Sequence, residues 1–316
     1  MGLRRSPPWD LPALLREVPG PQAFGQPLAS LTSIRIGGPA DALVRVETLA
    51  ALHSLQMVAR SQAIPLFVVG GGSNLLIRDG GLRGIVVLIR GTFRSYSIEP
   101  CTASRSASEV SVHVGVGYPL SRLSLHLGRQ GWSGLEFAYG IPGTLGGAMV
   151  MNAGTNLGDM RQVLMTARML LRDGQIQEVP ASAVGLRYRG SSYPEGAVLL
   201  GATLRLRQGE QQHIETVMRE SYAQRQRTQP LSQPNTGSVF KNPPGTSAGR
   251  LIEALGLKGK RVGGAMISPR HANFIVNVGQ ATAADVETLI AHIQQGVQRA
   301  HHIDLEPEVH VVGEEG

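Results

Sequence analysis

The chain has 316 residues, of which 42% are hydrophobic and 17% charged, so it can build about two packed domains and is not a disordered protein. Its net charge is +7, yet only three of the 30 cationic residues are lysines, the arginines are scattered, and aromatic residues make up 4%. This pattern disfavours a nucleic-acid-binding surface and favours small anionic ligands, whose phosphate or carboxylate groups match a planar guanidinium.

The first part of the chain predicts an irregular segment followed by strands and helices. Residues 1–25 are rich in proline and predict an irregular lead-in with one short helix. Residues 65–69 form a short apolar run that ends in three glycines, as a buried strand entering a loop does. The other predicted elements of this part are strands over residues 42–46, 85–89 and 110–114 and helices over residues 48–60 and 119–127.

From residue 163 onward the pattern is richer in strands. Residues 167–179 predict a hairpin around Asp173-Gly174, and residues 198–207 alternate like a half-buried strand. A polar helix over residues 213–227 precedes a Gln/Pro/Asn-rich joint over residues 229–235. The end of the chain predicts helices over residues 248–255 and from Thr282 onward, and strands over residues 273–278 and 308–312.

Together these elements predict an α+β fold in which strands and helices are intermixed. We expect a first domain made of two subdomains and a smaller second domain. The predicted boundaries are residues 1–25 for the lead-in, 26–210 for the first domain, with subdomains of about 26–90 and 91–210, and 211–316 for the second domain.

Membrane, disulfide and metal chemistry are not expected from the sequence. No run of about 18 apolar residues occurs, and Pro7, Pro8 and Pro12 interrupt any leader-like stretch near the start. The single cysteine, Cys101, rules out an intrachain disulfide and a cysteine-based zinc site, and the histidines lack metal-ligand spacing. We therefore expect a cytoplasmic protein without a structural metal.

Three glycine-rich segments are candidates for ligand binding: residues 70–74, 115–117 and 140–148. The first two lack the final glycine of a G-x-G-x-x-G fingerprint, and the chain contains no G-x-x-x-x-G-K-[ST] sequence. Consecutive glycines still let backbone N–H groups converge on an anion. Two such loops with neighbouring hydroxyl and amide side chains suit a ligand that carries a pyrophosphate, although tight turns between strands explain them equally well.

Single residues elsewhere give weaker signals. Ser238 lies three residues before Lys241, but no nucleophile elbow surrounds it. Arg189 precedes a turn, and Glu308 lies near the end of the chain. Taken alone, each of these residues is more often structural than catalytic.

The order of the segments along the chain is more specific than any one of them. Thr32-Ser33-Ile34-Arg35-Ile36-Gly37-Gly38, Tyr188-Arg189-Gly190-Ser191 and Glu306-Pro307-Glu308-Val309 are three of them. In this order they resemble the family of UDP-N-acetylenolpyruvoylglucosamine reductases, flavoenzymes of bacterial peptidoglycan-precursor synthesis. The resemblance covers about residues 30 to 313 and also includes residues 69–75, 140–148, 152–154, 237–243, 255–259 and 271–274.

The resemblance implies an FAD-binding domain of the vanillyl-alcohol-oxidase type, built from two α+β subdomains, followed by a smaller domain that binds a UDP-sugar. It also implies that NADPH reduces non-covalently bound FAD. The reduced flavin then transfers hydride to the enolpyruvyl double bond of UDP-N-acetylglucosamine enolpyruvate, and the product is UDP-N-acetylmuramate.

The resemblance also implies a catalytic trio. Hydride transfer leaves negative charge beside the substrate carboxylate, and Arg189 matches the family arginine that can hold that carboxylate with two parallel hydrogen bonds. Glu308 matches the catalytic glutamate, and we expect its pKa to be raised in the complex so that it assists an anion. Ser238 matches the serine that gives a proton to the carbanion.

The remaining site predictions concern binding. Residues that match substrate contacts are Tyr188, Lys241, Asn242 and, for the diphosphate, Arg225 or Arg227. The residues expected to bind FAD are Val69, Gly70, Gly71, Gly72, Ser73, Asn74, Gly140, Ile141, Pro142, Gly143, Thr144, Gly146, Gly147 and Ala148.

The chain departs from the family pattern in two places. A tyrosine that the family commonly has after its Asn-x-Gly sequence is replaced here by Thr155-Asn156. No long insertion with a tyrosine lid separates Tyr193 from Arg225, which indicates the shorter subclass. The sequence therefore leaves open how the bound substrate is covered.

Two other functions also fit parts of the sequence. The first is a different flavin enzyme on the same fold, such as an alcohol or lactone oxidase, but the glycine loops contain no His or Cys for a covalent flavin bond. The second is a nucleic-acid-binding module, which the basic charge suggests. We expect small-molecule partners only, with no membrane span and no obligate protein partner.

Overall fold

The computed structural model describes residues 8–101 and 108–316, so part of the lead-in and of the leader-like start lies outside the described residues. The rest of the lead-in contains the predicted short helix, α1 (Leu11–Leu14), whose first turn is capped by Asp10. It also contains β1 (Gln22–Phe24), which the sequence did not predict.

A four-stranded sheet follows, with the order β1-β2-β5-β3. β2 and β3 run parallel to β5, and β1 runs antiparallel to β2. The predicted helix α2 (Leu49–Ser61) connects β2 to β3 and is capped by Thr48. The bounds of the strands are β2 (Ala40–Val46), β3 (Leu66–Val69) and β5 (Leu82–Ile89).

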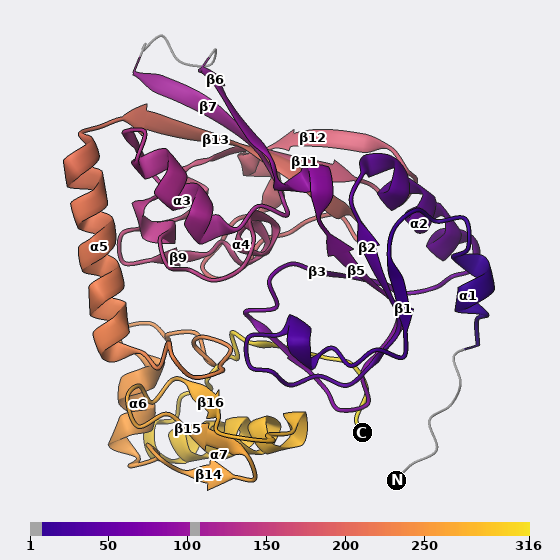
Figure 1. The fold of residues 1–316 in the computed structure, drawn as a ribbon. Helices are drawn as coiled ribbons and strands as arrows, with labels where there is room; N and C mark the ends of the chain where they lie inside the picture. The colour runs from indigo at the N-terminus through magenta and orange to yellow at the C-terminus, as the bar shows by residue number, and fades with distance from the viewer. Residues whose placement is uncertain (1–7, 102–107) are drawn as a thin grey trace.

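A second, antiparallel sheet lies beside the first (Figure 1). Its order is β12-β11-β13-β7-β6, and β8 pairs with the end of β13. The predicted hairpin is confirmed as β11 and β12. The strands are β6 (Tyr96–Pro100), β7 (Glu109–Gly115), β8 (Trp132–Ser133), β11 (Leu164–Leu170), β12 (Ile176–Pro180) and β13 (Val198–Gln208).

Three helices accompany this second sheet. α3 (Leu120–Gly128) and α5 (Gln211–Thr228) were predicted, whereas α4 (Leu145–Met151) was not. α5 packs against α3 through Ile214 and Met218, which approach Gly128 so closely that a Cβ there would lie 2.9 Å from the Met218 sulfur. From this sheet α5 runs down to the C-terminal part of the chain (Figure 1).

The C-terminal part contains a three-stranded antiparallel sheet with the order β14-β15-β16. Thr282 and Asp285 form the predicted capping box at the start of its long helix. The elements are α6 (Ala248–Ala254), β14 (Arg261–Val262), β15 (Ala265–Ile267), β16 (Ile275–Asn277) and α7 (Ala283–His301).

Buried side chains do not divide cleanly along the chain. One large cluster joins both sheets and includes Val87, Val112 and Leu204. A second cluster fills the C-terminal part but also takes in Ile34 and Ile36, from the segment before β2, and Leu76, from the strand at residues 75–77, which buries a continuous interface. The boundaries at residues 25, 90 and 210 stay a prediction.

The last strand returns to the start of the molecule. β17 (His310–Val312) pairs in parallel with β4 (Leu75–Ile77), the strand that directly follows the first glycine loop. Beyond β17, Glu314 exchanges backbone hydrogen bonds with Gly80 and Gly81. The C-terminal residues are therefore built into the same region as the glycine loop.

Three further features concern a membrane span, a metal site and the single cysteine. Within the part of the chain that the structure describes, no helix is long and apolar enough to cross a membrane. The same residues contain no group of three or more His, Cys, Asp or Glu side chains that could hold a metal ion. Cys101 is buried.

Candidate active site

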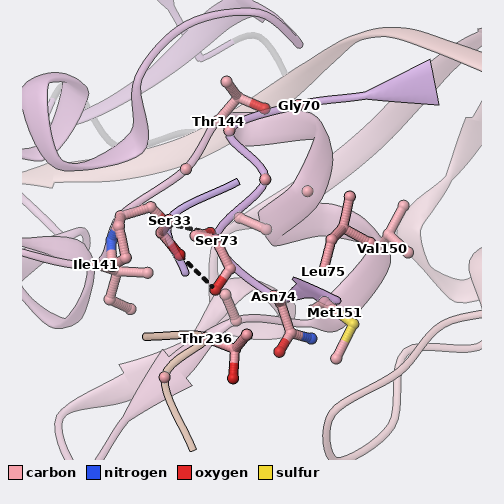
Figure 2. A pocket seen from close by; sticks show the side chains of 18 of the residues that line it. Ser33, Gly70, Ser73, Asn74, Leu75, Ile141, Thr144, Val150, Met151 and Thr236 are labelled. Carbon is pink, nitrogen blue, oxygen red and sulfur yellow. Dashed lines mark hydrogen bonds between the residues drawn. The ribbon is translucent and has the colours of Figure 1, made fainter. Parts of the chain in front are cut away.

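A cavity of about 950 Å³ lies where the two sheets and the C-terminal part meet. Its size is at the upper end of the roughly 300–1,000 Å³ that small-molecule pockets occupy. Figure 2 shows side chains from the first glycine loop, from α4 (Val150 and Met151) and from the later segment with Thr236 around one space. All the residues predicted to bind FAD line this cavity, as do Arg189, Ser238 and Glu308.

The two main glycine loops pack directly against each other. A Cβ on Gly71 would lie 2.5 Å from the Gly143 Cα, and one on Gly70 would lie 2.6 Å from the Thr144 hydroxyl. The Ser73 hydroxyl donates to the Pro142 carbonyl at 3.1 Å. These glycines are thus required by loop–loop packing, and the two loops form one continuous wall of the cavity.

Gly147 has a different environment. It lies in the first half of α4, lines the cavity, and has no atom within 4 Å of its Cβ position. Glycine within a helix costs about 0.5–1 kcal/mol relative to alanine. Since no atom packs against the Cβ position, packing inside the protein does not explain the choice of glycine at residue 147. The open space on the cavity side of α4 explains it.

Backbone pairing fixes Ser238 and Glu308 relative to each other. The Glu308 N–H donates to the Val239 carbonyl at 2.7 Å, and the Lys241 N–H donates to the Glu306 carbonyl at 2.9 Å. The Asn74 side chain donates to the Glu308 carbonyl at 2.9 Å. The segment after Ser238, the segment around Glu308 and the first glycine loop are therefore one connected structure.

Arg189 lies next to Glu308 on the cavity wall. Its Nε lies 2.9 Å from Glu308 Oε1, although the N–H direction misses hydrogen-bond geometry, and its Nη2 donates to the Gly154 carbonyl at 3.0 Å. The guanidinium lies 5.2 Å from the centre of the Tyr188 ring. The backbone of Arg189 is left-handed, with φ of 53°.

Burial raises the pKa of Glu308, while the nearby positive charges of Arg189 and Lys241 lower it in opposition. Burial is the larger cause, so the direction agrees with the expectation for the substrate complex. A carboxyl held this way keeps its proton at a higher pH than an exposed glutamate does.

Arg225 is a partly buried cation whose buried Nη1 atom has no hydrogen-bond partner among the described residues. Its Nε donates to Gln229 Oε1 at 3.2 Å, and Nη1 lies 3.3 Å from the Cβ position of Gly140. Burial lowers its pKa. An unpaired guanidinium on the cavity wall suits an anionic ligand, whereas the alternative candidate Arg227 is exposed.

The other predicted substrate residues lie beside the cavity rather than on its wall. The Asn242 N–H points to the Tyr188 hydroxyl at 3.5 Å, and Tyr188 is 52% exposed. Lys241 Nζ lies 2.5 Å from Glu306 Oε1. Their predicted roles remain predictions.

Several cavity residues were missed from the sequence. Ser33 donates to the Asn235 carbonyl at 2.6 Å and so joins the first sheet's loops to the joint before Ser238. The resembling segment around Ser33 was a signal that could have found it, whereas Met151 and His310, whose sulfur and Nε2 lie 3.0 Å apart, carried none.

The first departure from the family pattern can be placed. Thr155 and Asn156 both line the cavity. Tyr222 of α5 also lines it, with its ring against Gly140 and edge-on to the Tyr139 ring at 5.4 Å. An aromatic side chain on the cavity wall is thus supplied by α5.

A cradle of glycine loops between two sheets, facing a partly buried arginine–carboxylate pair, defines a cofactor-dependent oxidoreductase of the FAD-binding class. Residues 40–180 match the family described as "FAD binding domain", and residues 229–312 match "UDP-N-acetylenolpyruvoylglucosamine reductase, C-terminal domain". The predicted α+β fold with an FAD-binding domain is confirmed.

Similar proteins agree along nearly the whole chain. UDP-N-acetylenolpyruvoylglucosamine reductase 2 of Symbiobacterium thermophilum is 43% identical over 96% of this chain and 96% of its own length. The corresponding reductase of Anaeromyxobacter dehalogenans is 45% identical over 95% of this chain and 88% of its own length. The crystal structure of UDP-N-acetylenolpyruvylglucosamine reductase from Thermus caldophilus superimposes with a TM-score of 0.78 at 38% identity, covering 93% of this chain and 98% of that one. The chain belongs to the UDP-N-acetylenolpyruvoylglucosamine reductase family.

Proposed function

We propose that the protein uses NADPH, through FAD, to reduce the enolpyruvyl group of UDP-N-acetylglucosamine enolpyruvate to UDP-N-acetylmuramate, a precursor of peptidoglycan. The observation that carries this proposal is the pairing of Arg189 with Glu308 at 2.9 Å, on the wall of a cavity that also contains Ser238 and both glycine loops. NADPH and the nucleotide sugar are cytoplasmic metabolites, which agrees with a cytoplasmic enzyme.

The described residues fit FAD. Bound FAD supplies a hydride that it has received from NADPH. The loops at residues 70–74 and 140–144 would hold it, and the open space beside Gly147 would let it approach the backbone of α4. Arg225 supplies positive charge on the cavity wall, and its Nη1 would bind the diphosphate of the UDP-sugar substrate.

Arg189 acts on the substrate carboxylate. When hydride reaches the terminal carbon of the double bond, the electron pair moves to the carbon beside the carboxylate, and the substrate becomes a dianion. The guanidinium stabilises this charge with its own positive charge and its N–H donors. Because Arg189 already lies on the cavity wall, little reorganisation is needed.

Glu308 and Ser238 act on the same anion. Protonated Glu308 adds no further negative charge beside the dianion, and the burial that raises its pKa favours this form. The Ser238 hydroxyl donates its proton to the carbanion, which forms the new C–H bond. Backbone pairing between the two segments keeps both groups on one side of the substrate.

The remaining predicted contacts lie beside the cavity. Tyr188, Lys241 and Asn242 would contact the substrate there. The sequence between residues 193 and 225 forms β13 and α5 with short connections, which agrees with a shorter subclass without an inserted lid. We propose residues 26–210 as the FAD-binding domain and 211–316 as the substrate-binding domain.

Stopped-flow mixing tests this function. Enzyme reduced with NADPH should return to the oxidised flavin spectrum when it meets UDP-N-acetylglucosamine enolpyruvate. Ser238→Ala should leave reduction by NADPH intact and slow this return by about 100-fold or more, as expected for loss of a general acid. Equal damage to both half-reactions would contradict the proton-donor role, and protein that cannot be reconstituted with FAD would contradict the whole proposal.

A further inference from the structure

We infer that Asn152 is the positioning residue that fixes Arg189 for the oxidative half-reaction. The inference rests on the proposed function of Arg189 and gives Asn152 a role of its own. The turn that carries Arg189 is unusual. Arg187 and Gly190 exchange two backbone hydrogen bonds, of 2.9 and 3.2 Å, so that Arg189 is the third of four turn residues.

The third turn position here has φ of 53°, a value that favours glycine and is strained for arginine. Such strain persists only when neighbouring groups over-determine the conformation. Something near the turn must therefore hold it.

Asn152 holds the turn in place through side-chain hydrogen bonds. Its Nδ2 donates to the Arg187 carbonyl at 3.0 Å and to Asp159 Oδ2 at 3.2 Å, and its Oδ1 accepts from the Arg161 N–H at 2.9 Å. Both amide hydrogens and the amide oxygen are used, so the side chain has one orientation. It is 1% exposed, so these bonds do not compete with water.

The same residue also ends α4. Asn152 is the left-handed C-cap of this helix, with φ of 41°, a conformation that asparagine tolerates well. A neighbouring bond from the Ser191 hydroxyl to the Val150 carbonyl, 2.7 Å long, ties the other side of the turn to the same helix. Arg189 therefore takes its position from α4, whose first half carries Gly147 on the cavity wall.

Asn152 does not line the cavity, whereas Arg189 and Gly154 do. Gly154 accepts the Arg189 Nη2 bond at 3.0 Å, two residues after Asn152. Both ends of the arginine, backbone and guanidinium, are thus set by the segment that Asn152 begins.

Asn152→Asp is the sharpest variant, since it keeps the size of the side chain and the acceptor for Arg161 but replaces both donors with a charged oxygen. We expect FAD binding and the NADPH-driven reduction to change less than about twofold. The return of the flavin spectrum with the enolpyruvyl substrate should slow by about 10- to 100-fold, as displacement of a reacting group by an ångström does. Asn152→Gly, which keeps the left-handed backbone without strain, should show the same split.

A double-variant comparison separates positioning from ordinary capping. In an Arg189→Ala background, Asn152→Asp should alter the reoxidation rate by less than about threefold, because a residue that acts through Arg189 has nothing left to position. His302 is a matched control, since it is the left-handed C-cap of α7, and His302→Asp should leave both half-reactions unchanged.

Three results would overturn the inference: multiplicative effects in the double variant, equal loss in both half-reactions, or wild-type reoxidation in Asn152→Asp. Wild-type reoxidation in Arg189→Ala alone would instead refute the proposed role of Arg189, so the two failures are distinguishable.

Discussion

Glu308 is subject to two opposing influences at the residue scale. Burial favours its neutral form, and the positive charges of Arg189 and Lys241 favour its ionised form. Proteins often tune a catalytic carboxyl by such a balance. The net direction here is a raised pKa, and this gives the oxidative half-reaction a pH dependence of known sign.

The rate of flavin reoxidation should fall as the pH rises through the raised pKa of Glu308, because the protonated form is the active one. Glu308→Gln stays neutral at every pH, so the part of the fall that belongs to Glu308 should disappear. Lys241→Met removes a charge that stabilises the carboxylate, so the fall should move to higher pH. Stopped-flow rates across a pH series measure this, and an unchanged profile in Glu308→Gln would refute it.

The same shift affects stability. The folded protein holds the Glu308 proton more tightly than the unfolded chain, so stability is lost as the pH rises from the ordinary carboxyl range through the raised pKa. Glu308→Gln should lose less stability over that interval. Urea unfolding at a series of pH values tests the sign, and a larger loss in the variant would contradict it.

The sequence predicted many of the residues that line the cavity, but it did not predict how they contact one another. The glycine loops predicted a close backbone approach, and the resemblance to the reductase family predicted Arg189, Ser238 and Glu308. The pairing of Arg189 with Glu308 joins residues far apart in sequence, and no local pattern encodes it. The sequence pointed to Asn152 only as part of a matching segment, because a buried amide that bonds the Arg187 carbonyl, the Asp159 carboxylate and the Arg161 N–H leaves no periodic signal.

Glycine requirements differ between elements. Gly71 lies in a loop where a Cβ would strike Gly143, whereas Gly147 lies in α4 with open space beside it. The fold requires the first glycine, whereas we propose that a bound ligand requires the second. Substitution by alanine separates these reasons.

Gly147→Ala should raise the stability of the FAD-free protein by about 0.5–1 kcal/mol, because alanine favours the helix. It should also weaken FAD binding, because the new methyl group takes cavity space. Gly71→Ala is the matched variant, and it should destabilise the FAD-free protein. Thermal melts without cofactor and fluorescence titrations with FAD measure both effects. Unchanged FAD affinity in Gly147→Ala would place the flavin elsewhere.

Long elements with clear periodicity were predicted correctly, including α2, α5 and α7. The elements that were missed are short. β1 and β4 have three residues each, too few for an alternating pattern, and α4 contains Gly146 and Gly147, which lower helix propensity. β4 exists because β17 pairs with it, and that partner comes from the other end of the chain.

At the scale of the whole molecule, the C-terminal part depends on residues from the beginning. Ile34, Ile36 and Leu76 belong to its buried cluster. Asp79 accepts hydrogen bonds from the Ala283 and Ala284 N–H groups at the start of α7, and Arg78 pairs with Glu287 at 2.8 Å. Charge and composition in the sequence gave no sign of this dependence, since it is a property of chain topology.

A fragment of residues 229–316, expressed alone, should therefore not fold cooperatively. It would expose the surface that those apolar side chains cover and would leave β17 without β4. Circular dichroism and urea titration of the fragment test this. A single sharp unfolding transition would show that the C-terminal part folds independently. The N-terminal residues that contact it would then bind an already folded domain.

The pairing of β17 with β4 also constrains the order of events during protein synthesis. A ribosome finishes the first glycine loop long before it makes the strand that pairs beside that loop. At about 5–20 residues per second, the wait is on the order of ten seconds or longer. Throughout that time residues 75–77 lack the partner strand, and the loop lacks the Asn74 contact with Glu308. The wall of the cavity, which Glu308 and His310 help to line, is therefore complete only when translation is nearly over.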